Sequence, residues 1–357
     1  MSEIAITRRK SRQVQIGPLA MGGEAPIVIQ SMLNSKTTDV GGSLLQIGRL
    51  AEAGCQLVRL AIPNANALPA FEEIKKRSPL PLVADIHFDY RLALGAMDGG
   101  ADKIRINPGN IGARDKVRQV VEKAVACRIP IRIGVNSGSV EKEILQQEGG
   151  PTVRALVRSA MRNVDLCREF GAEDLVLSLK SSDVLRTIAA YQLAAEECDL
   201  PLHIGVTEAG TVKSGTIKSA VALGILLHQG IGDTLRVSLT GDVIEEVIAA
   251  RHILKSLNLV EQGITLISCP TCGRTQVDLV NIAERVEAGL AHIRIPLTVA
   301  VMGCVVNGPG EAREADIGVA CGRGSAVLIK RGQIVRKIAE DEIVQTLIDE
   351  VNNWPAE

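Results

Sequence analysis

The sequence has 357 residues, of which 46% are hydrophobic and 23% charged, and its formal net charge is -1. This composition predicts a globular protein with enough apolar material for one large α/β barrel plus a small domain. Aromatic residues make up only 2% of the chain, so neither a basic field nor aromatic stacking platforms favour a nucleic-acid partner.

The amino terminus and the apolar runs bear on localisation. The first residues, MSEIAITRRKSRQ, contain no apolar stretch of the kind found in a secretory signal. No apolar run approaches the roughly 18 residues that would span a bilayer. We therefore expect a soluble cytoplasmic protein without a membrane partner.

Residues 25 to 242 repeat one pattern: a short run of Val, Ile and Leu, a polar turn with glycine, and a helical segment such as 113–126 or 242–257. This alternation is typical of parallel βα units, and no G-x-G-x-x-G or Walker A motif accompanies it. Eight units in about 220 residues predict a (β/α)₈ TIM-type barrel, an α/β fold, rather than an open doubly wound sheet. The expected strands are 25–32, 55–62, 81–88, 103–109, 130–138, 174–182, 201–210 and 234–242.

The pattern changes after residue 257, which predicts a small α+β domain behind the barrel. We expect the barrel to cover residues 1–258 and the second domain residues 259–357. The elements expected in the second domain are a strand at 264–269, a helix at 275–290, a strand at 297–304, a hairpin at 325–338 and a final helix at about 340–353.

The eight cysteines are scattered apart from one C-x-x-C pair. A chain this long with such spacing does not resemble the disulfide framework of a small secreted domain, and clustered cysteines in a reducing compartment more often bind metal. Four of them fall within strand or helix patterns and are expected in the core. These are Cys55, Cys127, Cys167 and Cys198.

The C-x-x-C pair lies in SCPTCGR, residues 268–274, and supplies Cys269 and Cys272. A tight turn brings two such sulfurs to the same side, where they can bind one metal centre. Cys304 ends the next predicted strand, which would return beside that turn in a βαβ-like unit. We therefore expect the three thiols to converge.

The fourth ligand decides the chemistry of this centre, and two candidates remain. Cys321 would complete a closed Cys₄ site, which is typical of structural zinc. Glu311 would leave an iron-sulfur cluster with one exchangeable oxygen ligand that a substrate oxygen can replace. The Asn-Gly-Pro-Gly turn at 307–310 favours Glu311, because its glycines allow the chain to fold the carboxylate back toward Cys304.

Positive charges recur at the ends of the predicted barrel strands, where barrel enzymes assemble their sites. The acids near the same ends are mainly Asp85, Asp89 and Glu208, so positive charge is in excess. Burying unpaired cations is costly, and arginine forks match phosphate oxygens, so we expect a phosphorylated or diphosphorylated small molecule. The cations are Arg59, Arg105, Arg132, Lys180 and Arg236.

Two further residues are candidates for proton transfer. His87, in DIHFD, suits either a hydrogen-bonding role or catalysis. Glu208, in VTEAG, is a carboxyl group among cations and a bound polyanion, so it can serve as a general acid in a closed site.

Taken together, these motifs resemble the bacterial 4-hydroxy-3-methylbut-2-enyl diphosphate synthases over essentially the whole chain. The resemblance rests on CPTCGR and GCVVNGPGEA behind a barrel with QSM, ADIHFD, KIRINPGN, RIGVNSGS, SLKSSD and GVTEAG. It implies reductive ring opening of 2-C-methyl-D-erythritol 2,4-cyclodiphosphate in the non-mevalonate isoprenoid route. It also implies a 4Fe-4S cluster that receives electrons from flavodoxin or ferredoxin.

The resemblance also implies a role for each matching residue. Glu208 would donate a proton, and Asn307 would face the substrate. The implied cluster ligands are Cys269, Cys272, Cys304 and Glu311. The implied diphosphate ligands are Arg59, Arg105, Arg132, Lys180 and Arg236, with Asp85, His87, Asn136 and Ser238 nearby.

Chain direction bears on assembly. The eighth barrel helix runs away from the face that carries the site, and residues 258–263 span roughly 20 Å at most. A head-to-tail homodimer, in which each small domain caps the partner's barrel, overcomes this distance, and the family resemblance implies the same arrangement. Two other interpretations remain: a non-redox phosphate-binding barrel enzyme with a zinc-stapled small domain, and an electron-transfer protein whose barrel is only a scaffold.

Overall fold

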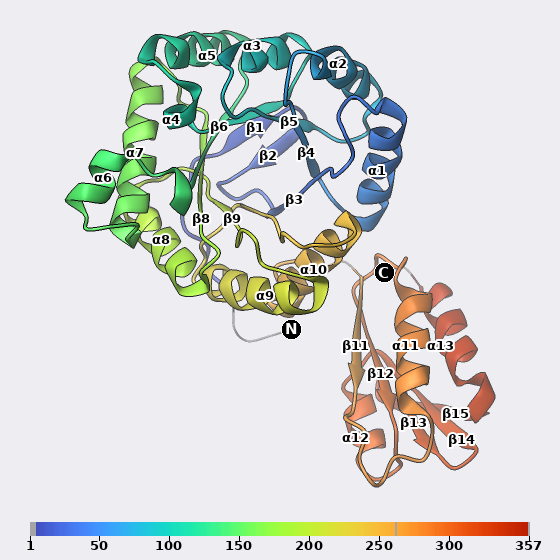
Figure 1. The fold of residues 1–357 in the computed structure, drawn as a ribbon. Coiled ribbons are helices and arrows are strands. Elements are labelled where there is room, and N and C mark those ends of the chain that lie inside the picture. The colour runs from blue at the N-terminus through green and yellow to red at the C-terminus, as the bar shows by residue number, and fades with distance from the viewer. Residues whose placement is uncertain (1–4, 261–262, 356–357) are drawn as a thin grey trace. The chain divides into compact units, whose positions relative to one another are not determined.

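The computed structural model describes residues 5–260 and 263–355. The chain forms two compact units that divide between residues 260 and 261 (Figure 1). Each unit has its own hydrophobic core. The linker expected at 258–263 lies partly outside the described residues. None of the helices in the described ranges is long and apolar enough to cross a membrane.

The first unit is a barrel of eight parallel strands in the order β8-β7-β6-β5-β4-β3-β10-β9. A parallel bridge between Leu177 and Leu202 joins the two ends of this order, so the sheet closes on itself. The structure therefore confirms the TIM-type barrel, and every strand lies within its expected range. The strands are β3 (Val28–Met32), β4 (Leu57–Ala61), β5 (Leu82–Asp85), β6 (Lys103–Ile106), β7 (Ile131–Asn136), β8 (Leu175–Lys180), β9 (His203–Ile204) and β10 (Thr234–Leu235).

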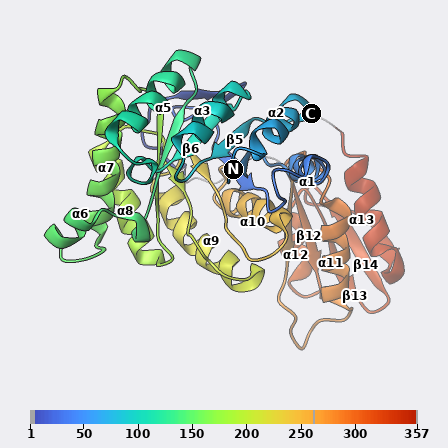
Figure 2. The same cartoon turned by 45° about the horizontal axis from the view of Figure 1, so that its top comes forward.

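Helices surround the barrel, and the short α6 stands outside the ring beside α7 (Figure 2). Several helices begin directly after an aspartate whose carboxylate accepts a hydrogen bond from a backbone N–H of the first turn. This contact stabilises the start of a helix at that point. The four aspartates are Asp39, Asp89, Asp183 and Asp242. The helices are α1 (Val40–Ala53), α2 (Ala67–Arg77), α3 (Tyr90–Asp98), α4 (Pro108–Ile111), α5 (Arg114–Cys127), α6 (Lys142–Gln147), α7 (Val153–Glu169), α8 (Val184–Glu197), α9 (Val212–His228) and α10 (Val243–Ser256), with a 3₁₀ turn at Ser137–Ser139.

A hairpin that the sequence pattern did not predict closes the amino-terminal end of the barrel. Its strands, β1 (Val14–Ile16) and β2 (Leu19–Met21), pair antiparallel and are visible through the barrel in Figure 1. Strands of three residues are too short to show a hydrophobic period, so they are missed by pattern alone. The hairpin packs against side chains from the first halves of the barrel strands, namely Val28, Leu57, Val83 and Val176.

The second unit is a five-stranded sheet in the order β11-β12-β13-β14-β15. The first three strands are parallel and the last two antiparallel. Val299 and Val301 of β12 face the core formed with α11 and α13, whereas Ala300 and Met302 face α12. The elements are β11 (Ile264–Ser268), α11 (Leu279–Leu290), β12 (Leu297–Met302), α12 (Gly308–Arg313), β13 (Ile317–Gly322), β14 (Ser325–Lys330), β15 (Gln333–Ala339), a 3₁₀ turn at Glu340–Glu342 and α13 (Ile343–Asn352).

Two expectations for this unit were wrong. Strand β13 was not predicted, because its small residues give no clear alternation of hydrophobic and polar positions. One of these small residues, Gly318, packs tightly: a Cβ at this position would approach the Cβ of Ala300 to 2.7 Å. The turn at 307–310 is the start of helix α12, with Asn307 at the N-cap and Pro309 in the first turn, a position that tolerates proline because no N–H is needed there.

The cysteines outside the C-x-x-C region only partly follow their expected burial. Cys55 and Cys167 are buried and Cys198 is half-buried. Cys127 is exposed at the end of α5, so its expected place in the core was wrong. All eight cysteines are free thiols.

Candidate active site

The barrel interior gathers the five cations singled out in the sequence. Arg59, Arg105 and Arg132 lie within β4, β6 and β7, Lys180 ends β8, and Arg236 follows β10. Burial and the neighbouring cations lower the pKa of Arg132 and of Lys180 well below their ordinary values. The cations are therefore close enough to repel one another, and we call these five side chains the cationic ring.

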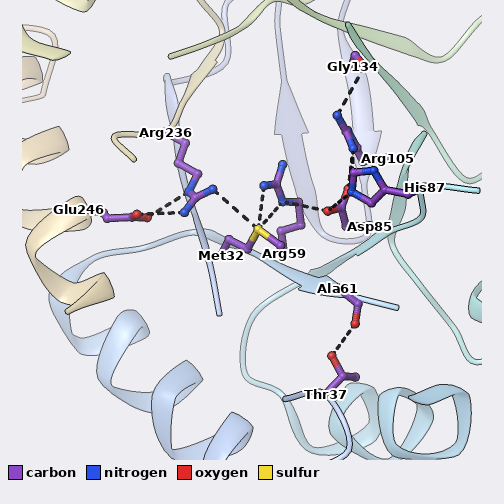
Figure 3. A network of polar contacts seen from close by, with 10 residues as sticks. All are labelled: Met32, Thr37, Arg59, Ala61, Asp85, His87, Arg105, Gly134, Arg236 and Glu246. Atoms are coloured by element: carbon purple, nitrogen blue, oxygen red, sulfur yellow. Dashed lines mark hydrogen bonds and ion pairs between the residues drawn. The ribbon is translucent and has the colours of Figure 1, made fainter. Parts of the chain in front are cut away.

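One side of the cationic ring is organised by Asp85, the last residue of β5 (Figure 3). Arg105 Nη1 donates to Asp85 Oδ1 at 3.2 Å, and His87 Nε2 lies 3.3 Å from Asp85 Oδ2. Arg59 Nε lies 3.9 Å from the same carboxylate. Burial alone would raise the pKa of Asp85, but Arg59, His87 and Arg105 outweigh it and hold that pKa far below its ordinary value. Asp85 is thus ionised and orients two arginines.

The other side contains a carboxylate that sequence reasoning missed. Glu246 of α10 is 3% exposed and accepts from Arg236 Nε at 3.0 Å and Nη2 at 2.9 Å. It also accepts from Ser31 Oγ and from the Leu239 backbone N–H. The sequence signal was a glutamate on the apolar face of an amphipathic helix, since Val243, Val247 and Ala250 around it are also buried. Arg236 therefore forms a bidentate ion pair with Glu246.

Methionine Met32 at the end of β3 joins the two sides. Its sulfur accepts from Arg59 Nε at 3.0 Å and Nη2 at 2.7 Å, and Arg236 Nη1 lies 3.7 Å away (Figure 3). Burial lowers the pKa of Arg59 to about 10, with Asp85 opposing that effect. A thioether is a weak, uncharged acceptor, so it holds the Arg59 guanidinium in place without neutralising it.

The cationic ring has few counter-charges. Arg132 is 1% exposed, and its Nε and Nη1 have no hydrogen-bond partner among the described residues. The buried carboxylates that contact the ring are Asp85 and Glu246, against five cations. An anion with several oxygen acceptors would satisfy these donors and balance the charge.

Two glycines give the cations room. A Cβ at Gly134 would lie 2.6 Å from Arg105 Nε, and one at Gly205 would lie 2.8 Å from Lys180 Nζ. Both distances are too short for a real contact, so each glycine allows a cation to lie against the strand backbone.

We expect Gly134→Ala to weaken binding of inorganic pyrophosphate by about ten-fold, because Arg105 must leave its place beside Asp85. Isothermal titration calorimetry measures this affinity. Gly48→Ala is the matched control, since a Cβ there meets nothing within 4 Å. Equal affinities in the two variants would show that the Arg105 position is not required.

The remaining predicted barrel residues lie around the ring without bonding to its cations in the described part of the chain. Glu208 is exposed, with a left-handed φ of 52°, a conformation that costs a non-glycine residue energy and is frequent at functional sites. Asn136 ends β7 half-buried, and its backbone N–H donates to Ser139 Oγ. Ser238 is half-buried after β10.

In the second unit, the C-x-x-C loop is bound to the end of β12. Gly303 N–H donates to Cys269 Sγ at 3.3 Å, and Gln276 N–H donates to the Gly303 carbonyl at 3.0 Å. Parallel pairing of β11 with β12 places these strand ends side by side. The structure therefore brings Cys269 next to the residue before Cys304, and the convergence of all three thiols stays a prediction.

Two of the thiols lie in surroundings that favour the thiolate form. Backbone and side-chain hydrogen bonds from Arg274 lower the pKa of Cys272, which is exposed. Backbone N–H groups of Asn307 and Val306 lower the pKa of Cys304. A lowered pKa favours the thiolate, which is the form that binds metal, so this donor set suits a soft metal centre.

Cys321 differs from these thiols. It is fully buried on β13 in the core beneath α11, and burial raises its pKa to about 12. Its full burial in the core sets Cys321 apart from the exposed Cys272.

The acidic candidate Glu311 is exposed in the first turn of α12, four residues after the exposed Asn307. Beside Cys304 lies a hollow of about 670 Å³ lined by Arg274, Gln276 and Arg323 among others. Within residues 5–260 and 263–355, no three His, Cys, Asp or Glu side chains are already grouped around a single-ion position.

Solved structures show the same fold at low identity. A Yersinia pestis dihydropteroate synthase aligns with a TM-score of 0.50 at 18% identity, covering 69% of this chain and 98% of that chain. A 3-dehydroquinate dehydratase from Geobacillus kaustophilus aligns with a TM-score of 0.51 at 14% identity, covering 71% and 98%. These likenesses support the barrel architecture alone.

Sequence comparisons are far more specific. Curated proteins named 4-hydroxy-3-methylbut-2-en-1-yl diphosphate synthase (flavodoxin) are 57% identical in Geobacter sulfurreducens, over 98% of this chain and 99% of that protein, and 53% identical in Bacillus subtilis, over 97% and 92%. The GcpE TIM-barrel domain matches residues 11–251, and the GcpE protein C-terminal domain matches residues 265–353. The chain therefore belongs to the GcpE family, which confirms the resemblance noted in its motifs.

Proposed function

We propose that this protein is an oxidoreductase that converts 2-C-methyl-D-erythritol 2,4-cyclodiphosphate into 4-hydroxy-3-methylbut-2-enyl diphosphate in the non-mevalonate isoprenoid pathway. The observation that carries the proposal is the cationic ring, whose buried arginine and lysine donors lack enough carboxylates. A diphosphate supplies the missing negative charge, and the family membership specifies which diphosphate.

Support also comes from the names of the relatives, which state the product of the reaction and, in parentheses, flavodoxin. By extension we propose flavodoxin or ferredoxin as the electron donor of this chain. The scaffold-only alternative would not need buried cations at five strand positions. The non-redox alternative needs Cys321 as a zinc ligand, and this thiol is fully buried in the core of the second unit.

We further propose that Cys269, Cys272, Cys304 and Glu311 hold a 4Fe-4S cluster. The thiols of Cys272 and Cys304 favour the anionic form, and Cys269 is fixed by the Gly303 N–H. When bound, such a cluster supplies single electrons and, through the carboxylate position, an exchangeable site on iron.

Glu208 is the proposed proton donor for loss of water. Support comes from its position four residues after the end of β9, on the side of the barrel where such enzymes carry their catalytic groups, and from its exposure and left-handed backbone. Asn136, Ser238 and His87 complete the proposed substrate contacts from neighbouring strand ends. Asn307, at the start of α12, would approach the substrate from the cluster domain.

We propose a head-to-tail homodimer in the cytoplasm as the working form. Helix α10 ends at Ser256 and β11 begins at Ile264, so the connection is short compared with the height of a barrel. Two-fold dimers are the commonest closed oligomers. All eight cysteines are free thiols, which suits a reducing compartment.

Anaerobic purification tests the function directly. We expect the protein to contain iron rather than zinc and to turn over the cyclic diphosphate with a chemical reductant. Zinc in place of iron, or no turnover by iron-loaded protein, would overturn the proposal.

The ring itself is tested by Arg105→Met and Arg132→Met. Each change is expected to weaken binding of the cyclic diphosphate by about 2–4 kcal/mol, since each removes one partner of a buried charged contact. Calorimetry on oxidised protein, which cannot turn over, measures the affinity. Unchanged affinity in both variants would exclude these arginines from the site.

A further inference from the structure

The barrel interior contains more unsatisfied polar atoms than the cationic ring accounts for. Nine buried side-chain nitrogen or oxygen atoms in the described residues have no hydrogen-bond partner, and seven of them belong to barrel strands. Three of these seven are on Arg105 and Arg132 of the ring. The other four are both amide atoms of Gln30, His203 Nε2 and Lys103 Nζ.

Lys103 lies directly beneath the ring on strand β6. It is two residues before Arg105, so both side chains point to the same face of the strand, with Lys103 about 7 Å deeper. Its strand neighbour is Val83, which packs against the hairpin at the amino-terminal end, whereas the neighbour of Arg105 is Asp85. Lys103 therefore lies between the floor of the barrel and the ring.

No counter-charge compensates Lys103. It is 0% exposed, and it forms no ion pair within the described chain. The charged or titratable groups near it are Arg132 of β7, Arg59 of β4 and His203 of β9, while Asp85 of β5 is paired with Arg105. Burial, then Arg132 and Arg59, lower the pKa of Lys103 well below its ordinary value.

We propose that Lys103 is a further ligand of the diphosphate group, reaching it from below the cationic ring, where the anion supplies the acceptor that the amine lacks. The inference rests on the proposed function, because it needs a diphosphate on the ring. The amine takes its proton from solvent as the anion enters, so no other reactant is required.

The physical reason is that a buried amine without a partner destabilises the ligand-free barrel. An apolar side chain of similar length would fill the same space without that penalty. If Lys103 were structural, its amine would need an acceptor in the ligand-free protein, and it bonds to none among the described residues. A bound diphosphate has several oxygen acceptors, and its negative charge would offset the repulsion that Arg132 and Arg59 exert on the Lys103 amine.

Lys103→Met tests the inference with three readouts on the anaerobic, oxidised holoenzyme. First, the melting temperature without ligand should stay the same or rise. Second, affinity for 2-C-methyl-D-erythritol 2,4-cyclodiphosphate should fall at least about ten-fold. Third, calorimetry in buffers of different ionisation enthalpy should show fewer protons taken up per ligand than in wild type.

Ser219→Ala is the matched control, because Ser219 Oγ is also buried without a partner but lies on the outer helix α9. It should preserve both affinity and proton uptake. Lys103→Gln is a second variant that removes the charge, should the methionine variant not fold, and failure of both to fold would overturn the inference.

The outcomes separate this inference from the proposed function. Wild-type protein that does not bind the cyclic diphosphate would refute the proposed function itself. Wild-type protein that binds it, together with a Lys103→Met variant of equal affinity and equal proton uptake, would refute only the role of Lys103. A lower melting temperature with unchanged affinity would assign Lys103 a structural role instead.

Discussion

Glu311→Ala is expected to lower turnover of the cyclic diphosphate by more than about 100-fold while three cysteines still retain iron. The carboxylate lies in the first turn of α12, and we propose that it would hold the cluster together with the three thiolates. Its loss removes the group that keeps one iron position defined without removing any thiolate. Iron content and steady-state turnover of anaerobically purified protein are the two measurements.

Cys321→Ser is the matched control for that experiment. Cys321 lies fully buried in the core of the second unit, so we expect it to make no contribution to metal binding. The serine variant should retain its iron and most of its activity, with some loss of stability from a buried hydroxyl. If instead Cys321→Ser loses all metal and Glu311→Ala is fully active, the Cys₄ zinc interpretation is correct.

A mixed dimer of one Glu208→Gln chain and one Cys269→Ser chain is expected to regain activity that neither parent has. If each cluster domain serves the partner's barrel, one site of the mixed dimer combines an intact barrel with an intact cluster. Random exchange of equal amounts makes about half of the dimers mixed, each with one of two sites intact, so activity should reach about one quarter of wild type.

The same mixture gives a clear negative result if sites form within one chain. Every site would then contain either the barrel lesion or the cluster lesion, and the mixture would be as inactive as its parents. Size-exclusion chromatography confirms that exchange took place. Mixing Glu208→Gln protein with Arg105→Met protein is the control, because both lesions lie in the barrel and no arrangement should give an intact site.

The sequence by itself determined the barrel architecture. Runs of Val, Ile and Leu followed by glycine turns repeat eight times, and every strand formed where those runs lie. Hydrophobic periodicity is a local signal, which is why it could be read without coordinates. The C-x-x-C pair and the return of Cys304 were also readable, because parallel strand ends meet at one edge of a sheet.

Short elements could not be read in this way. The hairpin β1–β2 has three residues in each strand, and half of the residues of β13 are glycine or alanine. Such segments form because long-range packing stabilises them, against the barrel floor for the hairpin and against α12 for Gly318 of β13. Local propensity has little influence where tertiary contacts supply the stability.

Only the tertiary structure decided which charges are paired. Ser31 and Arg236 both bond to Glu246, although Ser31 and Glu246 are 215 residues apart in the chain. Sequence shows that cations recur at strand ends, but pairing depends on which side chains the closed barrel brings within hydrogen-bonding distance. That closure paired Arg236 with Glu246 and oriented Arg105 through Asp85. It left Arg132 Nε and Nη1 and Lys103 Nζ buried without a hydrogen-bond partner among the described residues, which is costly for charged groups.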